Sequence, residues 1–492
     1  MDAALKIEPL GVGLVYIPGL EPLFESPDGA VQVLELEPQV LWRYFPNKDQ
    51  PYENQLEFLK RLQALPQAKT IHGVGFPVGG SRIPDPRHIP PLSEAIQTLD
   101  GAWASEHLVF NEAVDAQGNS VQTGFFLPPL ATPAGVEAAC RTIAAVSGKL
   151  PVPFAVETPT NYLKPIPGEM SDGQFTKAVV EAADCGILLD LHNIWSNERN
   201  GRQTVEAFLS EIPLERVYEI HLAGGLKYGD YWLDAHSGDI PPPVIEWARR
   251  LIPHLPNLGA LVYEILPAYL PRFGLDGVRQ AVDQMHDLWS CRRATQESDS
   301  PFKKAKPKVL VTDNGLTPEV WERKLSAQIL FPSEYEGEDE LSRQLADDPA
   351  VLLIRELNRK FRLSAVISNL RMSIRLLMLS LDEASFDRLV ADYCFSRTPD
   401  RFAVNEAHHF AGYIRKLDLE IPYLYELLNY EITAMDVIAD GQARSVPFTT
   451  DPQTLLETLG RGELPIDLPT ADYEAEITPP EERVFETQNL IH

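Results

Sequence analysis

Eight short apolar segments alternate with helical patterns in the first part of the chain, and this alternation limits the possible folds more than any other feature. Several segments are almost continuous in Val, Ile and Leu, which is typical of parallel strands covered on both faces. Between them apolar residues recur with helical spacing, as in Phe175, Ala178, Val179 and Ala182. Eight βα alternations predict an α/β fold, a (β/α)8 TIM barrel, which usually has about 250 residues. The predicted strands lie near 12–17, 31–36, 69–76, 103–110, 153–158, 186–192, 217–223 and 261–266.

The length of 492 residues exceeds the usual size of one core, so a second domain is expected after the barrel. Residues 291–312 are polar and charged without periodicity, which indicates a linker. Amphipathic patterns beyond it predict a smaller, mostly helical domain with one short strand near 445–450. The predicted organisation is a barrel at 1–290, the linker, a helical domain at 313–465 and a loose acidic tail at 466–492.

Most of the later barrel strands end in residue types that bind metal ions. The C-terminal ends of the strands of such a barrel meet at one mouth, so these side chains would share a pocket. Burying so many charges together without a cation would be very unfavourable. Imidazole together with carboxylate suits iron, manganese or zinc. The candidate ligands are His72, His107, Glu157, Asp190, His192, His221 and Glu264 at strand ends, with Asp234 and His236 in the loop DAHSGD.

These candidates are too many for one ion, because a metal takes at most about six ligands and a catalytic site leaves one position open. Two or three ions held by bridging carboxylates are therefore expected. Asp190 and His192 are two residues apart, so on a strand they would share one face. We name Asp190, His192 and the adjacent Asn193 as catalytic candidates. His192 and Asn193 would either bind a metal or orient a ligand.

Other acidic residues flank this set. Glu35 and Glu37 share a face of their strand, and as ionisable neighbours of the pocket they would serve as ligands or as salt-bridge partners. Glu219 shares a face with His221 in the same way. Glu106 directly precedes His107, so its side chain should point to the opposite face of the strand, which favours a structural role.

Charge and cysteine usage exclude several classes of protein. A net charge of −28 argues against a nucleic-acid partner, because binding to phosphates needs Lys and Arg. The four cysteines are widely spaced with no CxxC, so a disulfide framework is not expected and a reducing cytoplasm is the simpler location. The first residues lack the pattern of a signal peptide, and we expect no membrane partner because no apolar stretch is long enough to span a bilayer.

A series of short motifs follows the predicted strands in order: GVGL (11–14), HGVG (72–75), EHL (106–108), VETPTNY (156–162), LLDLHN (188–193), IHLAG (220–224), DAHS (234–237) and YE (263–264). Residues 12–290 carrying these motifs resemble the multinuclear non-haem iron-dependent oxidative enzymes, which include the iron enzyme of methanobactin biosynthesis and its relatives that modify peptide cysteines. The resemblance implies a barrel similar to xylose isomerase with two or three irons (Fe2+/Fe3+) at its mouth. Its implied ligands are His72, His107, Glu157, Asp190, His221, Asp234, His236 and Glu264.

The resemblance also implies an activity: oxidation of a ribosomally made peptide with O2 as co-substrate, at cysteine. The helical domain is faintly similar to companion proteins of such enzymes, which suggests a fused domain that holds the substrate peptide. The chain departs from the family pattern at four positions. Glu106 stands where many relatives have Asp, Thr158 and His192 where they have Asn, and Gly225 where some carry a further His.

Two other functions fit the same residues. A barrel with His and carboxylate ligands could be a sugar isomerase or epimerase that uses a divalent metal and works without O2. Alternatively, the chain could be a scaffold or metal-storage protein whose helical domain does the work. The scaffold hypothesis predicts that replacing His107 or Glu264 leaves the biological role intact.

Overall fold

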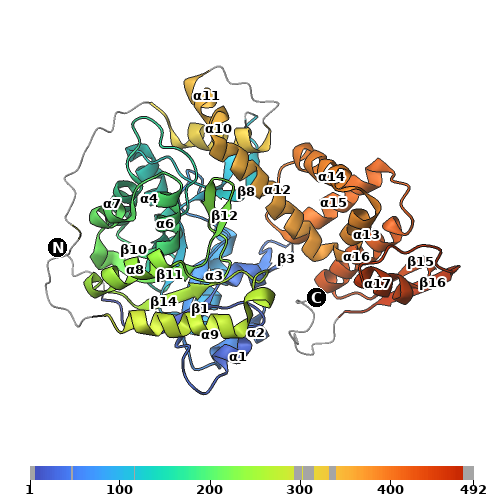
Figure 1. The fold of residues 1–492 in the computed structure, drawn as a ribbon, viewed down its shortest axis with the longest axis horizontal. Coiled ribbons are helices and arrows are strands. Elements are labelled where there is room, and N and C mark those ends of the chain that lie inside the picture. Colours follow the sequence, from blue (N-terminus) through green and yellow to red (C-terminus); the bar gives the residue numbers. More distant parts are fainter. Residues whose placement is uncertain are drawn as a thin grey trace. The chain divides into compact units, whose positions relative to one another are not determined.

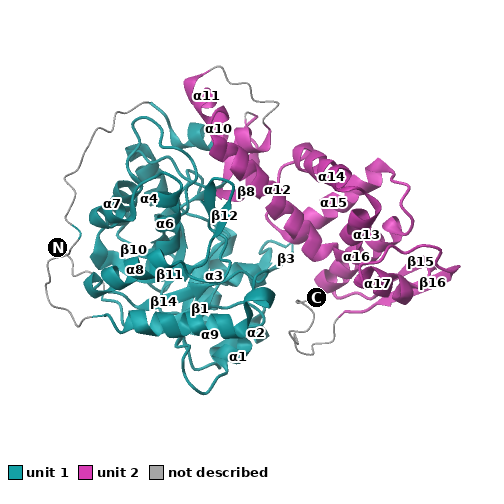
Figure 2. Ribbon diagram, viewed as in Figure 1, with its two compact units in different colours: residues 1–111, 127–322, 487–492 teal, residues 112–126, 323–486 magenta. Residues whose placement is uncertain are grey.

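The computed structural model describes residues 6–45, 48–115, 117–292, 302, 315–331 and 339–479. The chain forms two compact units, which are interleaved in sequence (Figure 2). The first unit contains residues 1–111, 127–322 and 487–492, and the second contains 112–126 and 323–486. The chain therefore enters the second unit briefly at 112–126, long before the main part of that unit begins.

The first unit is built around a closed barrel of eight parallel strands (Figure 1). Each strand pairs with the next barrel strand along the chain, and β14 closes the barrel by pairing with β1. The (β/α)8 prediction is confirmed, and all eight predicted strands form. They are β1 (Gly11–Val15), β2 (Val33–Leu36), β5 (Ala68–Gly73), β6 (Ala104–His107), β9 (Phe154–Glu157), β10 (Gly186–Asp190), β11 (Val217–Ala223) and β14 (Ala260–Glu264).

Helices connect the barrel strands and account for the continuous apolar runs, because they cover the outer faces of the strands. All seven residues of β11 and all five of β10 are buried. Several helices begin at the caps that the sequence offers: Thr132 accepts from Gly135 N, and Ser171 forms a capping box with Gln174. The helices are α1 (Glu21–Phe24), α2 (Leu56–Gln63), α3 (Ile89–Leu99), α4 (Pro133–Ser147), α5 (Asp172–Ala183), α6 (Leu191–Arg199), α7 (Val205–Glu211), α8 (Pro242–Leu251) and α9 (Leu270–Trp289), with short 3-10 turns between some of them.

Three loops that follow barrel strands carry two-stranded sheets of their own. These loops leave the C-terminal ends of β2, β6 and β11, the ends at which the candidate ligands lie. The pairs are β3 (Arg43–Tyr44) with β4 (Tyr52–Glu53), β7 (Phe110–Val114) with β8 (Ser120–Leu127), and β12 (Leu226–Tyr228) with β13 (Tyr231–Leu233).

The second unit is mostly helical, with a core that includes Val366, Leu370, Ile374 and Leu377. Its helices are α10 (Pro318–Leu330, which begins in the first unit), α11 (Glu340–Ala346), α12 (Pro349–Asn369), α13 (Arg371–Ser380), α14 (Glu383–Ser396), α15 (Ala403–Leu417), α16 (Leu424–Asp440) and α17 (Pro452–Gly460). The strand expected near 445–450 forms as β15 (Arg444–Thr450).

The expected loose tail at 466–492 is wrong for residues 470–477, which form β16 (Thr470–Ile477) antiparallel to β15. The strand escaped sequence analysis because it is acidic and mostly exposed, so no apolar alternation marks it. It is held by backbone pairing with β15, whose Val446 and Phe448 point into the core. The predicted linker 291–312 lies outside the described residues except at 291, 292 and 302.

The β7–β8 segment of the second unit is fixed by two polar contacts. The side-chain amide of Asn358 on α12 donates to the carbonyl oxygen of Thr123, and Arg401 Nη2 lies 3.1 Å from Glu112 Oε2. Gly124 has a φ of +68°, and a Cβ there would lie 2.6 Å from Pro399 Cγ, so the turn requires glycine. These contacts explain why residues 112–126 belong to the second unit.

No single helix among the described residues is long and apolar enough to cross a membrane, although α12 and α13, which meet at a bend of 115°, pass that test when taken together. The four cysteines are free.

Candidate metal centre

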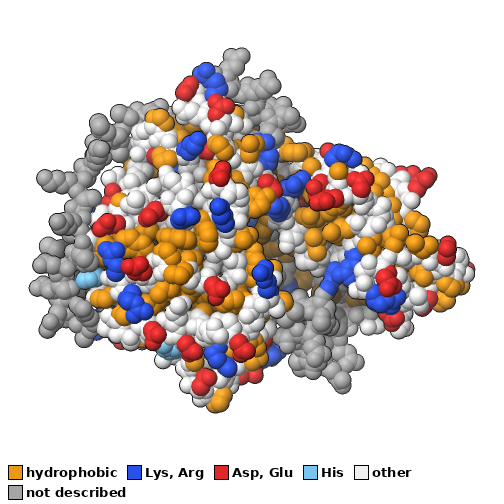
Figure 3. Space-filling view, viewed as in Figure 1, with side chains coloured by type: hydrophobic (Ala, Val, Ile, Leu, Met, Phe, Trp, Pro, Cys, Tyr) orange, Lys and Arg blue, Asp and Glu red, His pale blue; other side chains and the backbone are white. Residues whose placement is uncertain are grey.

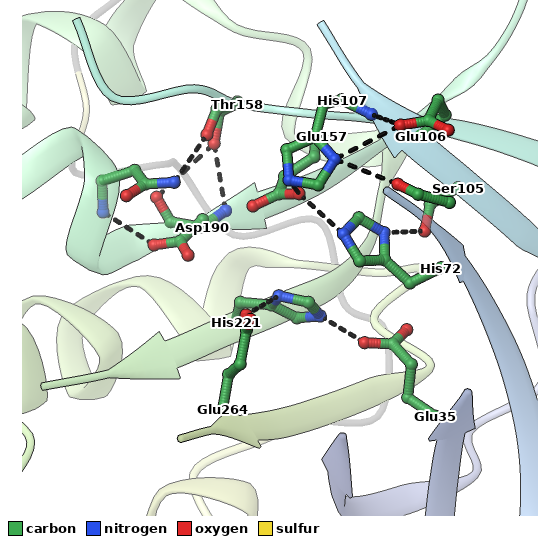
Figure 4. Close-up of polar contacts among 12 residues, drawn as sticks. Glu35, His72, Ser105, Glu106, His107, Glu157, Thr158, Asp190, His221 and Glu264 are labelled. Carbon is green, nitrogen blue, oxygen red and sulfur yellow. Dashed lines mark hydrogen bonds and ion pairs between the residues drawn. The ribbon is translucent and has the colours of Figure 1, made fainter. Parts of the chain in front are cut away.

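Neighbouring barrel strands bring most of the predicted ligands together at one end of the barrel (Figure 4). His107, Glu157, Asp190 and Glu264 are the last residues of β6, β9, β10 and β14, and His221 lies within β11. His72 lies near the end of β5, while Asp234 and His236 follow β13 in the loop. The inner ligands are buried, with an exposed fraction of 1% for His72, 3% for Glu157 and 0% for Asp190 and His221, whereas the side chains of His107, Asp234, His236 and Glu264 are 12–19% exposed.

Glu157 lies between two imidazoles. Its Oε2 is 3.0 Å from His72 Nε2 and 2.9 Å from His107 Nε2. Two ligand atoms bound at about 2.1 Å to one ion, at right angles, lie roughly 3.0 Å apart. The spacing of these three side chains therefore matches that of a shared metal ion.

A second run of contacts links His221 to the loop. Glu264 places Oε2 3.3 Å from His221 Nδ1 and Oε1 2.8 Å from His236 Nδ1. His236 in turn places Nε2 2.8 Å from Asp234 Oδ1. His236 has a φ of +43°, a conformation that a non-glycine residue seldom adopts, so the loop is held in an unusual shape where it presents this imidazole.

Several of the converging atoms are buried and form no hydrogen bond within the described part of the chain, although all but Asp190 Oδ2 lie within ion-pair distance of another of these side chains. Leaving a buried polar atom unsatisfied costs about 1–3 kcal/mol, and more when the group is charged. A metal ion would satisfy several of them at once, so the residues present fit such an ion. These atoms are Glu157 Oε2, Asp190 Oδ2, His192 Nδ1, His221 Nδ1, Asp234 Oδ1 and His236 Nε2.

Four groups of side chains could each hold an ion, because the ligand atoms within each group lie within 4.8 Å of one another; besides Glu35–Glu219–His221, three groups overlap through shared carboxylates. Glu157 belongs to the first two overlapping groups and Asp190 to the last two, so these carboxylates are placed to bridge neighbouring ions. The overlapping groups are His72–His107–Glu157, Glu157–Asp190–His221 and Asp190–His236–Glu264.

The outward nitrogen of each barrel histidine meets an acceptor. His107 Nδ1 lies 3.0 Å from the carbonyl oxygen of Gly73, and His221 Nε2 lies 2.7 Å from Glu35 Oε1. His72 Nδ1 lies 2.8 Å from Ser105 Oγ, whose hydroxyl donates to Ile71 O. Since each neutral ring carries its proton on the outward nitrogen, the inward nitrogen presents a lone pair to the centre.

Glu35 and Glu219 form a layer beneath His221. Glu35 accepts from Thr70 Oγ1 at 3.1 Å, and Glu219 accepts from Trp103 Nε1 at 2.8 Å. Burial and the nearby Glu35 carboxylate raise the pKa of Glu219 well above its ordinary value, which favours its protonated form. The sequence analysis placed Glu35 beside the pocket but did not predict its bond to His221. The period-two spacing of Glu219 and His221 was the available signal that carboxylates lie on the same side of the strand as this imidazole.

His192 and Asp190 do not share a strand face, contrary to expectation. β10 ends at Asp190, which becomes the N-cap of α6 and accepts from Asn193 N at 2.7 Å. His192 therefore lies in the first turn of a helix. Its Nε2 lies 3.1 Å from Trp232 Nε1, and its Nδ1 lies 3.2 Å from Asp234 Oδ1.

The bond from Trp232 determines the proton position on His192. An indole N–H only donates, so His192 Nε2 accepts and the neutral ring carries its proton on Nδ1, facing Asp234. This polarity is opposite to that of the barrel histidines, and His192 belongs to none of the four groups of described ligands. Gly225 leaves room for the arrangement, because a Cβ there would lie 2.1 Å from Trp232 Nε1 and 2.4 Å from His192 Nε2.

Both polar groups of the Asn193 side chain form hydrogen bonds within the protein. Its Nδ2 donates to Thr158 O at 3.3 Å, and its Oδ1 accepts from the Thr160 hydroxyl. Thr158 also accepts from Asp190 N at 3.0 Å through Oγ1, so these bonds join the loop after β9 to the end of β10. Glu106 accepts from Phe76 N and His107 N, and its Oε1 also lies 3.3 Å from His107 Nδ1, so it contacts the imidazole of a candidate ligand instead of pointing away from it.

In the metal-free centre, bound protons on histidine and carboxylate side chains balance the negative charge that metal ions would otherwise balance. Burial alone would lower the pKa of His107, but the charges of Glu157 and Glu106 outweigh it and raise the pKa well above 6.5. Burial would raise the pKa of Glu157, yet His107 and His72 hold it well below 4.5. Burial, with the charges of Asp234 and Glu157, raises the pKa of Asp190 well above 3.8. Metal binding would displace the histidine protons.

Residues 31–264 match the family of RiPP precursor modification enzymes described as MbnB/TglH/ChrH. A UPF0276 protein of Paraburkholderia phytofirmans is 30% identical over 210 residues, covering 41% of this chain and 67% of that protein. The chain belongs to this family. The family match ends at Glu264, so it includes every candidate ligand.

A further family relative, a UPF0276 protein of Streptomyces avermitilis, is 28% identical over 264 residues, covering 53% of this chain and 52% of that protein. The chain thus spans between half and two thirds of the length of these two relatives. Among solved structures, a xylose isomerase domain protein from Planctomyces limnophilus is 15% identical, with a TM-score of 0.37 over 57% of this chain and 97% of that chain. The barrel itself is defined by the strand pairing of this chain.

Proposed function

We propose that the chain is an iron-dependent enzyme that uses O2 to oxidise a ribosomally made peptide at cysteine. One observation carries the proposal: buried imidazole and carboxylate atoms that form no hydrogen bond converge at ligand spacing from Glu157 to His236 across the barrel mouth. Membership of a family of peptide-modifying enzymes supports the choice of substrate class. Two or three ions fit the overlapping groups, with Glu157 and Asp190 as bridges.

Some residues of the centre would bind the metal ions, and others orient these ligands. His72, His107 and Glu157 would hold one ion, and Asp190, His221, Glu264, His236 and Asp234 would hold the others. Bound iron would supply affinity for a thiolate and for O2, together with one-electron chemistry. Ser105, Gly73 O and Glu35 orient the three barrel imidazoles so that their lone pairs point inward. The burial of His72, Glu157, Asp190 and His221 would keep bulk water away from the inner part of the centre, while the partly exposed His107, Asp234, His236 and Glu264 would face the opening.

The second unit would hold the substrate peptide, and the enzyme would act in the cytoplasm. Its helices form a core separate from the barrel, and nothing in the proposed metal set comes from it. A dedicated binding unit would give the enzyme selectivity for one peptide without altering the metal centre.

The decisive experiment begins with anaerobic purification from iron-rich cells and elemental analysis. Two or three irons per chain, followed by a loss of mass or gain of oxygen in a candidate peptide encoded beside the gene, would support the proposal. The same peptide with Cys→Ser replacements should remain unchanged under air. Retention of only zinc, manganese or magnesium, with turnover of an aldose under anaerobic conditions, would replace the proposal with a sugar isomerase.

A further inference from the structure

A groove in the second unit lies between α10, α12 and α14, and encloses a cavity of about 280 Å³. One wall is a single face of α12, whose lining residues recur at intervals of three and four. The opposite wall is α14, and the end of α10 contributes Ile329 and Leu330. The groove is also lined by Leu352, Arg355, Glu356, Arg359 and Arg362 of α12 and by Phe395 of α14.

Two of the three arginines in the groove lack an acidic partner. Arg355 donates through Nη2 to Gln328 O at 2.7 Å, but its Nε is buried without a partner. Arg359, one turn further along α12, makes no hydrogen bond or ion pair within the described residues. Arg362 differs, because its Nε lies 2.7 Å from Glu406 Oε1.

Among the described residues that line the groove, the one acidic residue is Glu356, and it does not neutralise the charges of Arg355 and Arg359. Glu356 Oε1 lies 2.9 Å from Lys360 Nζ, so its charge is already matched. The groove therefore carries an excess of positive charge in a chain whose net charge is −28. An acidic ligand, which the rest of the surface would repel, finds a complementary charge here.

The mouth of the groove is apolar. Leu352 is 57% exposed and Phe395 is 48% exposed, one on each wall. Apolar side chains also lie among charged ones on the face of the second unit that Figure 3 shows. The cavity lies just below the range of about 300–1,000 Å³ that encloses a drug-sized molecule, and its size suits one or two side chains of a longer ligand.

We propose that this groove binds an acidic segment of the substrate peptide, with carboxylates on Arg355 and Arg359 and a large apolar side chain between Leu352 and Phe395. Guanidinium forms strong, directional bonds with carboxylate, and an amphipathic helix laid in a groove presents residues at the spacing of the α12 wall. This inference rests on the proposed function for the identity of the ligand, but not for its test, because binding needs neither iron nor O2.

The test selects peptides from a random phage library on the full chain and measures the Kd of the best one, labelled with fluorescein, by anisotropy. We expect enrichment of Asp or Glu beside Leu or Phe. Arg355→Glu with Arg359→Glu should weaken binding by roughly tenfold or more. The control, Arg371→Glu with Arg388→Glu, makes the same change of charge on helices of this unit at positions outside the groove and should leave Kd within about twofold.

Two further variants guard against misfolding. Leu352→Ser and Phe395→Ser alter exposed side chains and should each weaken binding while the melting temperature stays constant. A peptide with Lys in place of its acids should bind the double Glu variant better than the native chain. The proposal is overturned if no peptide is selected, if the selected peptides lack acids, or if free glutamate displaces them as well as the unlabelled peptide does. Peptide binding without any oxidation would instead count against the proposed function alone.

Discussion

The indole N–H of Trp232 donates to His192 Nε2 at 3.1 Å, and this bond turns a protonated nitrogen, rather than a lone pair, toward Asp234. Replacing Trp232 with Phe should release the other tautomer. Nδ1 and Asp234 Oδ1 would then both be acceptors, and a cation between them would be favoured. We expect the affinity for the ion nearest Asp234 to rise by about tenfold, the scale of effects from groups that orient ligands.

Titration of the metal-free protein against a competing chelator would measure this change. Trp195→Phe is the matched control, since Trp195 packs against Trp232 with ring centroids 5.0 Å apart. Unchanged affinity in Trp232→Phe would show that the tautomer of His192 has no bearing on the metal.

Glu157→Gln should remove more metal than any other single replacement. Glu157 Oε2 faces both His72 and His107, and the residue belongs to two ligand groups. Elemental analysis should show the loss of at least one ion per chain. Glu219→Gln is the control: Glu219 is buried nearby and favours its neutral form, so an amide should keep the bond from Trp103 and the full metal content. Equal losses in both variants would argue against bridging.

The stability of the metal-free protein should depend on pH at both ends. Nearby carboxylates outweigh burial and raise the pKa of His107 and His221 well above 6.5, so their contribution is full below 6.5 and is lost as pH rises through the raised values. Histidine charges outweigh burial and lower the pKa of Glu157 and Glu264 below 4.5. The contribution of these two carboxylates to stability is therefore present above pH 4.5 and is lost as the pH falls through the lowered pKa values.

Melting curves between about pH 2 and pH 9 would measure both limbs. Zn²⁺ should raise the melting temperature most on the alkaline side, because the ligands are then already deprotonated. A stabilisation by Zn²⁺ that is independent of pH would contradict this account of the centre.

Arg362→Ala should destabilise the second unit by about 3–5 kcal/mol, because it leaves Glu406 buried and unpaired. The Arg362 side chain is 3% exposed and that of Glu406 is 2% exposed. Chemical denaturation would give the change in the free energy of unfolding. Arg362→Met combined with Glu406→Leu should cost less than Arg362→Ala alone; a larger cost for the double variant would mean that the ion pair itself stabilises the unit.

The barrel could be predicted because each strand is a run of apolar residues, and barrel topology then placed His107, Glu157 and Glu264 together without knowledge of any distance. The same reasoning failed at His192, because the period-two argument holds only while the strand continues. The Asp190 carboxylate caps α6, and the chain changes from strand to helix at that residue. Trp232 is 40 residues away from its partner, and no local pattern announces such a bond.

Residues 112–126 give the order of synthesis a consequence for folding. The carbonyl oxygen of Thr123 accepts a hydrogen bond from Asn358, which lies 235 residues later in the chain. At a translation rate of about 5–20 residues per second, the ribosome needs roughly 12–47 s to supply that partner. Most of the barrel has emerged by then, so its β6–α4 connection must stay accessible until the helices arrive. A chain truncated after the barrel would leave this hairpin without its hydrogen-bond partners. The two units therefore depend on each other to complete folding.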